Sequence, residues 1–344
     1  MPNMIALFAP SKNPYRANLH THTNISDGEF SPEEVKAKYR KEGYQIVAFT
    51  DHEACFAHKE LTDETFLALT AYEMAINTKN PPDVYTKTYH LNLISKEPNQ
   101  TGMVCHDYAA DRDFWPGVHK ERNILSVENR EYDPQYVNHL IEEANRAGYF
   151  VTLNHPTWSR NSYPEYIGLK GLWGVEIWNT ACVMLGHDEQ NVRVWNDLLQ
   201  AGTTVYPVAA DDFHHDCDGF GGWLMVDAPE LTYPAVISAL ENGDFYASTG
   251  PELHSAVVED GQLCIRCSPS RLIQIGTNCR KCFRSSAEKG GKLITEAEFD
   301  LRLWASMQTE EQKDHAWFRI TLEDAEGRHA YSRAYTYREI EAAL

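Results

Sequence analysis

The order of apolar and polar positions predicts alternating strands and helices from about residue 15 to residue 250. Apolar residues at helical spacing lie near residues 134–147, 188–201 and 232–242. Short apolar runs, each long enough for one buried strand, occupy Tyr44–Thr50, Thr88–Ile94, Tyr149–Leu153, Gly174–Trp178 and Thr204–Ala209. Such repeated strand–helix units are typical of a parallel sheet, either open or closed as a barrel.

One helix carries clear start and stop signals. Ser31 suits the N-cap position, Pro32 suits the first helical position, and Glu34 completes a capping box. Gly43 suits the C-terminal stop. This pattern predicts a helix over residues 31–43, directly before the first of the apolar runs.

Two segments depart from the strand–helix rhythm. Residues 96–131 show weak periodicity, which indicates an insertion that acts as a lid or binding loop, or else a plain surface excursion. After Gly250-Pro251, short alternating stretches separated by turn signals predict an all-β module. We therefore expect a barrel domain over residues 1–250 and a small sandwich-like β domain over residues 251–344.

Charge and composition narrow the classes of partner. The chain has 31 basic and 50 acidic residues, and its net charge of −19 disfavours nucleic acids and anionic membranes. It has no apolar run long enough to cross a membrane and no signal-peptide pattern, so we expect a cytoplasmic protein with a small-molecule substrate. Eight cysteines are too sparse for a disulfide scaffold. The pairs Cys264/Cys267 and Cys279/Cys282 are read as free thiols, with a structural zinc site as the alternative.

Side chains that can bind metal recur at the ends of the predicted strands. His20 and His22 are two residues apart, as are Asp212 and His214, and positions i and i+2 of a strand point to one face. Taken singly, such a histidine is more often an ordinary polar residue than a ligand. The full set of candidates is His20, His22, Asp27, His52, Glu73, His90, His155, Asp212 and His214.

The nine candidates together favour a metal centre. Imidazoles and carboxylates suit Zn²⁺, Mn²⁺ or Fe²⁺, and nine ligands are too many for one ion, so we expect two or three divalent ions. Glu73 is a strong single signal because an uncompensated carboxylate on an apolar strand is costly to bury. Asp51 is a candidate for orienting a ligand histidine.

The pattern resembles the PHP (polymerase and histidinol phosphatase) family of metal-dependent hydrolases. The resemblance implies a distorted (βα)₇ barrel that holds three divalent ions. The segment around Gly243–Pro251 and the β module after it are similar to the branch that includes carbaryl-type hydrolases. The matching pieces are Leu19–His22, Ser26–Gly28, Thr50–His52, Tyr72-Glu73, Tyr89-His90, Asn154–Pro156 and Asp212–His214.

The resemblance also implies which residues share an ion. The first ion takes His20, His22, Glu73 and Asp212, the second takes Glu73, His90 and His155, and the third takes Asp27, His52 and His214. The chain departs from the family pattern at Glu53, Asp211 and Phe213.

These observations predict a metal-dependent hydrolase that cleaves a small phosphorylated metabolite. The attacking group is expected to be a metal-bound hydroxide held by Glu73, Asp212, His155 and His214. Arg160, Lys120 and Arg122 are candidate contacts to an anionic substrate, although each could be a plain surface charge. Two alternatives stay open: hydrolysis of a carboxyl ester, carbamate or amide at the same site, or a non-catalytic, metal-stabilised binding module.

Overall fold

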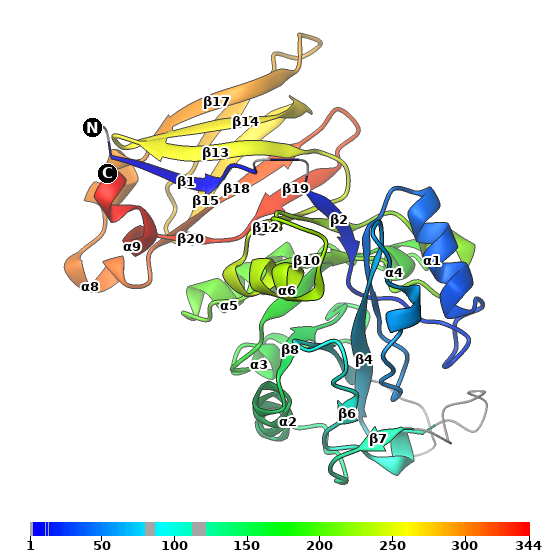
Figure 1. Ribbon diagram of the computed structural model, residues 1–344. Coiled ribbons are helices and arrows are strands. Elements are labelled where there is room, and N and C mark those ends of the chain that lie inside the picture. Colours follow the sequence, from blue (N-terminus) through cyan, green and yellow to red (C-terminus); the bar gives the residue numbers. More distant parts are fainter. Residues whose placement is uncertain (1–2, 11, 13, 80–86, 112–121) are drawn as a thin grey trace. The chain divides into compact units, whose positions relative to one another are not determined.

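The chain divides into two compact units, each described here by itself (Figure 1). The computed structural model describes residues 3–10, 12, 14–79, 87–111 and 122–344. The first unit, here called the site unit, comprises Tyr15–Leu224 and Ala228–Ser238. The second, here called the β-rich unit, comprises Met1–Pro14, Met225–Asp227 and Ala239–Leu344.

This division differs from the expected boundary between residues 250 and 251. The first strand, β1 (Met4–Phe8), pairs antiparallel with β13 (Leu253–Glu259) and so belongs to the β-rich unit. Strand β12 (Phe245–Ser248) pairs antiparallel with β19 (His329–Ser332) in the same unit. Both pairings join residues distant in sequence, and a local pattern of apolar positions carries no information about such partners.

The site unit is built on a mixed sheet. Strand β5 is antiparallel to both of its neighbours, β4 and β8, and every other neighbouring pair is parallel. Strand β4 follows β3 after a 3₁₀ turn, η1 (Lys59–Leu61), without an intervening α-helix. The seven strands of this sheet that lie wholly within the unit are, in order, β10 (Tyr206–Ala210), β9 (Gly174–Asn179), β8 (Tyr149–Leu153), β5 (Thr88–Ser95), β4 (Leu67–Asn77), β3 (Ile46–Phe49) and β2 (Tyr15–Asn18). The α/β class is therefore confirmed, whereas a regular (βα)₇ alternation is not.

The two outer strands of this row, β2 and β10, are joined just beyond their last residues. Thr21 and Phe213 form an isolated parallel bridge. The backbone N–H of His22 donates to the carbonyl of Phe213 at 2.9 Å, and the N–H of Asp212 donates to the carbonyl of His20 at 3.0 Å. These bonds bring the segment after β2 against the segment after β10.

Helix α1 (Pro32–Lys41) begins as the sequence predicts. The Ser31 side chain accepts from the backbone N–H of Glu34, and the Glu34 carboxylate accepts from the backbone N–H of Ser31. Val35 and Tyr39 on its buried face pack in a cluster with Phe49 of β3. The other helices of the site unit are α2 (Pro134–Arg146), α3 (Tyr163–Tyr166), α4 (Thr180–Met184) and α5 (Val192–Gln200), while α6 (Tyr233–Asn242) crosses the division between the units.

Within the expected insertion at 96–131, the structure describes residues 96–111 and 122–131. Strands β6 (Gly102–Met103) and β7 (Asn123–Ile124) pair in parallel as a separate two-stranded sheet. The N–H of His106 donates to the carbonyl of Ser126, and the N–H of Glu128 donates to the carbonyl of His106. The described parts of this segment are therefore ordered by their own backbone hydrogen bonds.

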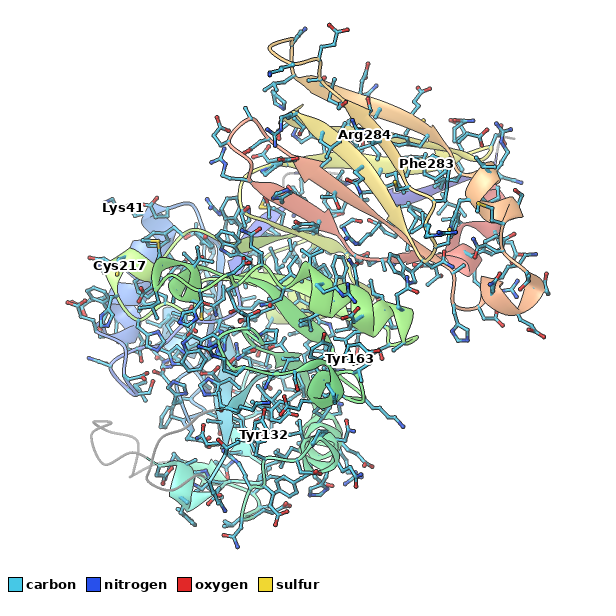
Figure 2. The ribbon with its side chains drawn as sticks, turned by 180° about the vertical axis from the view of Figure 1, so that it is seen from behind. Lys41, Tyr132, Tyr163, Cys217, Phe283 and Arg284 are labelled. Carbon is cyan, nitrogen blue, oxygen red and sulfur yellow. The ribbon has the colours of Figure 1, made fainter. Side chains whose placement is uncertain are left out.

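The β-rich unit contains two sets of strands whose apolar residues share one core. Leu263, Ile275 and Phe318, from three different strands, belong to a buried cluster with Trp304. Along β16, Phe283 is half-buried against this cluster and Arg284 is exposed (Figure 2). One set is β1, β13, β14 (Gln262–Ser270) and β17 (Ile294–Asp300), and the other is β12, β19, β18 (Trp317–Glu323), β15 (Leu272–Thr277) and β16 (Phe283–Ser286), with β20 (Tyr335–Thr336) paired to β18.

Two details of the β-rich unit differ from expectation. It is not purely β, since it contains three short helices, α7 (Arg302–Ser306), α8 (Glu310–Lys313) and α9 (Tyr337–Ile340), of which α8 and α9 begin with capping boxes. Cys264 is half-buried and Cys267 is buried, three positions further along β14, so the two side chains point to opposite faces. This geometry disfavours the alternative of a shared zinc site in that pair. No helix among the described residues is long and apolar enough to cross a membrane.

Candidate metal centre

The structure gathers all nine candidate ligands in the site unit. Most follow the last residue of a strand, while Glu73 lies within β4 and His90 within β5. The bridge between Thr21 and Phe213 places the pair His20/His22 against the pair Asp212/His214. Phe213, the bulky departure from the family pattern, is fully buried in the cluster that holds Tyr39, so its ring anchors the chain between two ligands.

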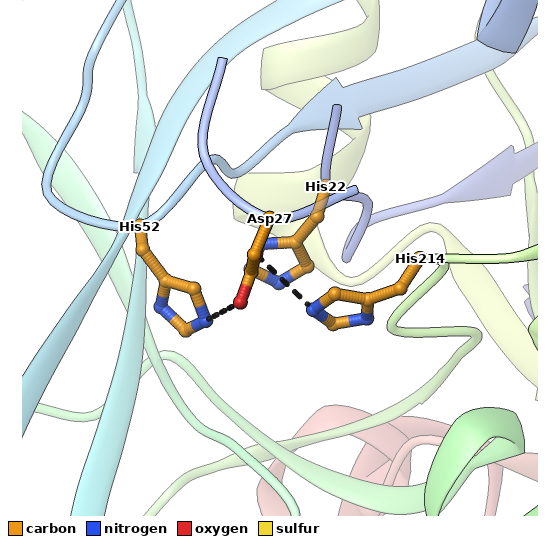
Figure 3. Close-up of side chains that lie close together, drawn as sticks. All are labelled: His22, Asp27, His52 and His214. Carbon is orange, nitrogen blue, oxygen red and sulfur yellow. Dashed lines mark ion pairs between the residues drawn. The ribbon is translucent and has the colours of Figure 1, made fainter. Parts of the chain in front are cut away.

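One group of ligand atoms surrounds Asp27 (Figure 3). Asp27 Oδ1 lies 3.4 Å from Nε2 of His214 and 3.5 Å from Nδ1 of His22. Its other oxygen, Oδ2, lies 3.5 Å from Nε2 of His52. These are the three residues expected at the third ion, with His22 added to them.

A second group brings together the residues expected at the first ion. Asp212 Oδ1 lies 3.1 Å from Nε2 of both His20 and His22. The Glu73 carboxylate approaches the same nitrogen atoms, at 3.3 Å from His20 and 3.5 Å from His22. His22 therefore presents Nε2 to this group and Nδ1 to Asp27, so it lies between the two groups.

Glu73 also reaches the residues expected at the second ion. Its Oε1 lies 3.1 Å from Nδ1 of His90 and 3.4 Å from Nε2 of His155. Its Oε2 lies 3.0 Å from Nδ1 of His52. Only 1% of the Glu73 residue surface is exposed. A single buried carboxylate thus faces every one of the three groups.

The donor set and its spacing fit divalent metal ions. Metal–ligand bonds of about 2.1 Å give tetrahedral edges of about 3.4 Å between ligand atoms. The distances quoted above scatter around that value. Nδ1 of His22 is buried and has no hydrogen-bond partner in the described part of the chain, as expected for an atom at a metal site.

The sequence model of the PHP domain matches residues 18–190, which is half of the chain. The chain belongs to the PHP domain family. Seven of the nine candidate ligands lie within the PHP match, and Asp212 and His214 lie beyond it. The structure brings these two to the other seven.

Similar solved structures share little sequence with this PHP chain. A two-domain protein from Bacteroides vulgatus that contains a predicted PHP-like metal-dependent phosphoesterase is 12% identical, with a TM-score of 0.43, covering 95% of this chain and 97% of its own. An amidohydrolase from Chromobacterium violaceum is 15% identical, with a TM-score of 0.43, covering 67% of this chain and 96% of its own. A search of curated proteins found no match.

Charge inside the PHP site is balanced between carboxylates and imidazoles. Burial alone would raise the pKa of Glu73, but the charges of His90 and His20 hold it well below its usual value. Burial alone would lower the pKa of His155, but Glu73 and Asp212 raise it to about 9. Without metal, protons on imidazoles therefore compensate the carboxylates, and a divalent ion competes with those protons.

Glu176, on β9, contacts two candidate ligands and is not among the residues predicted from the sequence. Its Oε1 lies 2.6 Å from Nδ1 of His20, and its Oε2 accepts from the backbone N–H of His155 at 2.8 Å. It stands in the apolar run Gly174–Trp178 and is 1% exposed. Like Glu73, Glu176 is a carboxylate on an apolar strand, where burial without a compensating partner is costly.

Asp51 has a different role from the predicted one. Its carboxylate accepts from the backbone N–H groups of Thr23 and Ser26 and from both hydroxyls. It therefore orders the loop that leads to Asp27, and the prediction that it orients a ligand histidine is wrong.

A cavity of about 780 Å³ adjoins the cluster. Arg160 lines this cavity and is exposed. Lys87, which the sequence analysis did not single out, also lines it and forms an ion pair with Glu165 at 2.8 Å. Seven of the nine candidate ligands line the wall: Asp27, His52, Glu73, His90, His155, Asp212 and His214.

The other two predicted substrate contacts are placed differently. Arg122 is not among the described residues that line the cavity, and its guanidinium donates two hydrogen bonds to Asp111, at 2.7 and 2.8 Å. Its charge is thus already compensated within the protein, which corrects the expectation of a direct substrate contact. Lys120 lies outside the described residues.

Proposed function

We propose that this protein is a metal-dependent hydrolase that cleaves phosphate esters of small molecules. The observation that supports the proposal most strongly is the convergence of six imidazoles and three carboxylates beside one cavity. The family membership of the chain supports it independently. Seven of these side chains line a cavity of substrate size, so a bound molecule can reach the ions.

The residues proposed to hold the ions are those implied by the family resemblance. His20, His22, Glu73 and Asp212 would hold one ion, and Glu73 with His90 and His155 would hold a second. Asp27, His52 and His214 would hold a third. When bound, Zn²⁺, Mn²⁺ or Fe²⁺ ions supply Lewis-acid activation of water and neutralise charge on the substrate.

Neighbouring polar residues fix the direction of the ligand side chains. Asn154 Nδ2 donates to Glu73 Oε1 at 2.8 Å, and Ser159 Oγ lies 3.0 Å from Nδ1 of His155. The Ser159 contact leaves Nε2 of His155 directed toward Glu73. Such contacts preorganise the site, so little reorganisation is needed when substrate enters.

Arg160 is proposed as the contact to the substrate's phosphate. It lines the cavity, and its side chain has no ion-pair partner in the described part of the chain. A planar guanidinium matches the oxygens of a phosphate in two parallel hydrogen bonds. This free cation favours an anionic ester over a neutral one.

The test is a substrate panel measured on protein of known metal content. Phosphate monoesters and diesters of p-nitrophenol should be hydrolysed, and a chelator should abolish turnover. Asp212→Ala should lose activity, whereas His254→Ala, an exposed histidine of the β-rich unit, should keep it. Turnover of p-nitrophenyl acetate but of neither phosphate ester would instead support the carboxyl-ester alternative. No turnover of any substrate by fully loaded protein would support the binding module.

A further inference from the structure

A second group of ligand-type side chains lies within the site unit and shares no residue with the nine described above. It consists of Cys105, Glu128 and His139. Cys105 Sγ lies 3.4 Å from Glu128 Oε1, and His139 Nε2 lies 3.1 Å from Glu128 Oε2. One ligand atom from each residue lies within 4.8 Å of the other two.

Three separate segments supply these side chains. Cys105 follows β6, and its backbone has a φ of +49°, which is uncommon for a residue with a side chain. Its N–H donates to the hydroxyl of Ser126 at 2.8 Å, which holds the thiol inward beside the segment after β7. Glu128 lies in that segment, and His139 lies on α2. These elements lie at one end of the site unit in Figure 1.

The three donors are those that proteins use for zinc. Bonds of about 2.3 Å to sulfur and about 2.1 Å to nitrogen and oxygen give tetrahedral edges of about 3.4–3.6 Å. The sulfur–oxygen separation of 3.4 Å matches that range, and the nitrogen–oxygen separation of 3.1 Å is a few tenths of an ångström shorter. A thiolate ligand favours Zn²⁺ and other metal ions that bind sulfur over Mg²⁺ or Ca²⁺, which prefer oxygen ligands.

We propose that Cys105, Glu128 and His139 form a mononuclear site for Zn²⁺. The thiol proton leaves to solvent as the Zn–S bond forms, and the oxidation state of the metal does not change. Cys105 is fully buried, while the side chains of Glu128 and His139 are 30% and 44% exposed. The fourth position therefore faces solvent and takes a water molecule.

The site ties α2 to the segments that follow β6 and β7. Tyr136, one turn before His139 on α2, donates its hydroxyl to Glu128 Oε2 at 2.9 Å and so orients the carboxylate. The ion would replace the weaker contacts among the three side chains by direct bonds. Its role is structural, and the proposal does not depend on the hydrolytic function proposed above.

Cobalt substitution tests this proposal with a signal that the nine-residue centre lacks. None of those nine residues is a cysteine, so a thiolate-to-cobalt charge-transfer band in the near ultraviolet reports on Cys105. The band should appear in the cobalt-loaded protein, vanish in Cys105→Ser, and persist in Cys264→Ser. Because Cys182 lines the cavity, Cys182→Ser serves as a second control and should also keep the band.

Metal analysis gives an independent readout. Cys105→Ser and His139→Gln should each bind one zinc ion fewer per chain than the unmodified protein. His139 is partly exposed, so its variant tests the site even if Cys105→Ser fails to fold. Absence of the band, its survival in Cys105→Ser, or an unchanged zinc content in His139→Gln would overturn the proposal and leave a hydrogen-bonded cluster only.

Discussion

Nδ1 of His20 lies 2.6 Å from Oε1 of Glu176, and both side chains are buried. This contact leaves Nε2 of His20 facing Glu73 and Asp212. The second oxygen of Glu176 accepts from the backbone N–H of His155, at a residue whose φ of +25° is uncommon. One carboxylate thus orients the ring of one candidate ligand and the backbone of another.

Glu176→Gln should therefore weaken metal binding without emptying the site. The amide can still contact His20, but it no longer carries the charge that polarises the ring. Loss of such a partner typically costs 10–100-fold in metal affinity. We expect the dissociation constant for Zn²⁺ or Mn²⁺, measured by titration of the metal-free protein, to rise by about that factor.

Glu64→Gln, an exposed glutamate of the same unit, is the matched control and should leave the affinity unchanged. An unaltered dissociation constant in Glu176→Gln would show that the contact to His20 does not act on the metal centre.

Removal of metal should lower the thermal stability of the protein. The charges of three carboxylates, Asp27, Glu73 and Asp212, are then compensated mainly by neighbouring imidazoles. At free metal 100-fold above the dissociation constant, binding contributes about 2.7 kcal/mol to the native state. For a unit of this size the midpoint of unfolding should fall by about 5–10 °C.

Scanning calorimetry with and without chelator measures the shift, and added metal should restore it. The same treatment of Asp212→Ala should give a much smaller change. An equal shift in both proteins would place the stabilising ion elsewhere in the chain.

Arg160→Ala should raise KM for a phosphate ester by about 10- to 100-fold, because a hydrogen bond to a charged group contributes about 1.5–3 kcal/mol. A neutral ester should be turned over as before, since no anion is bound. Arg146→Ala, an exposed arginine on α2, is the control. Steady-state kinetics give KM for both esters in each variant. An equal rise in KM for the phosphate ester and the neutral ester would contradict the phosphate contact.

His329, on β19, should make folding less favourable in acid. Burial lowers the pKa of His329 below 6.5, although Glu323 and Asp324 oppose that shift. As the pH falls through 6.5, the unfolded chain takes up a proton that the folded chain resists, so stability is lost toward acid. His329→Gln should unfold with a smaller change in midpoint between pH 7 and pH 5 than the unmodified protein. A steeper change would contradict this assignment.

Much of the site follows from short-range rules. The clustering of His20, His22, Asp212 and His214 at strand ends predicted that they come together, although both pairs lie just beyond β2 and β10 rather than on one face of a strand, and Asp212 has a φ of +58°. The capping signals at Ser31 and Glu34 likewise marked the start of α1 correctly. The capping prediction succeeded because it depends on a few neighbouring residues.

Other features depend on partners that are distant in the chain. Strand β5 pairs antiparallel with β4 and β8, and the order of apolar positions does not indicate the direction in which a strand runs. The pairing of β1 with β13 is hidden for the same reason. Cys105, Glu128 and His139 are brought together by three segments with irregular spacing. Glu176 differs from these cases, because its place on an apolar strand was a visible signal.

The most direct measurement of the central claim is the turnover of a phosphate ester by His22→Ala under saturating metal. His22 faces Asp212 with one ring nitrogen and Asp27 with the other, so its loss disturbs two groups of ligands at once. Removing a group that acts at the reacting centre costs about 10²–10³-fold. The account predicts a loss of that order, with His254→Ala unaffected. Full activity in His22→Ala would contradict it.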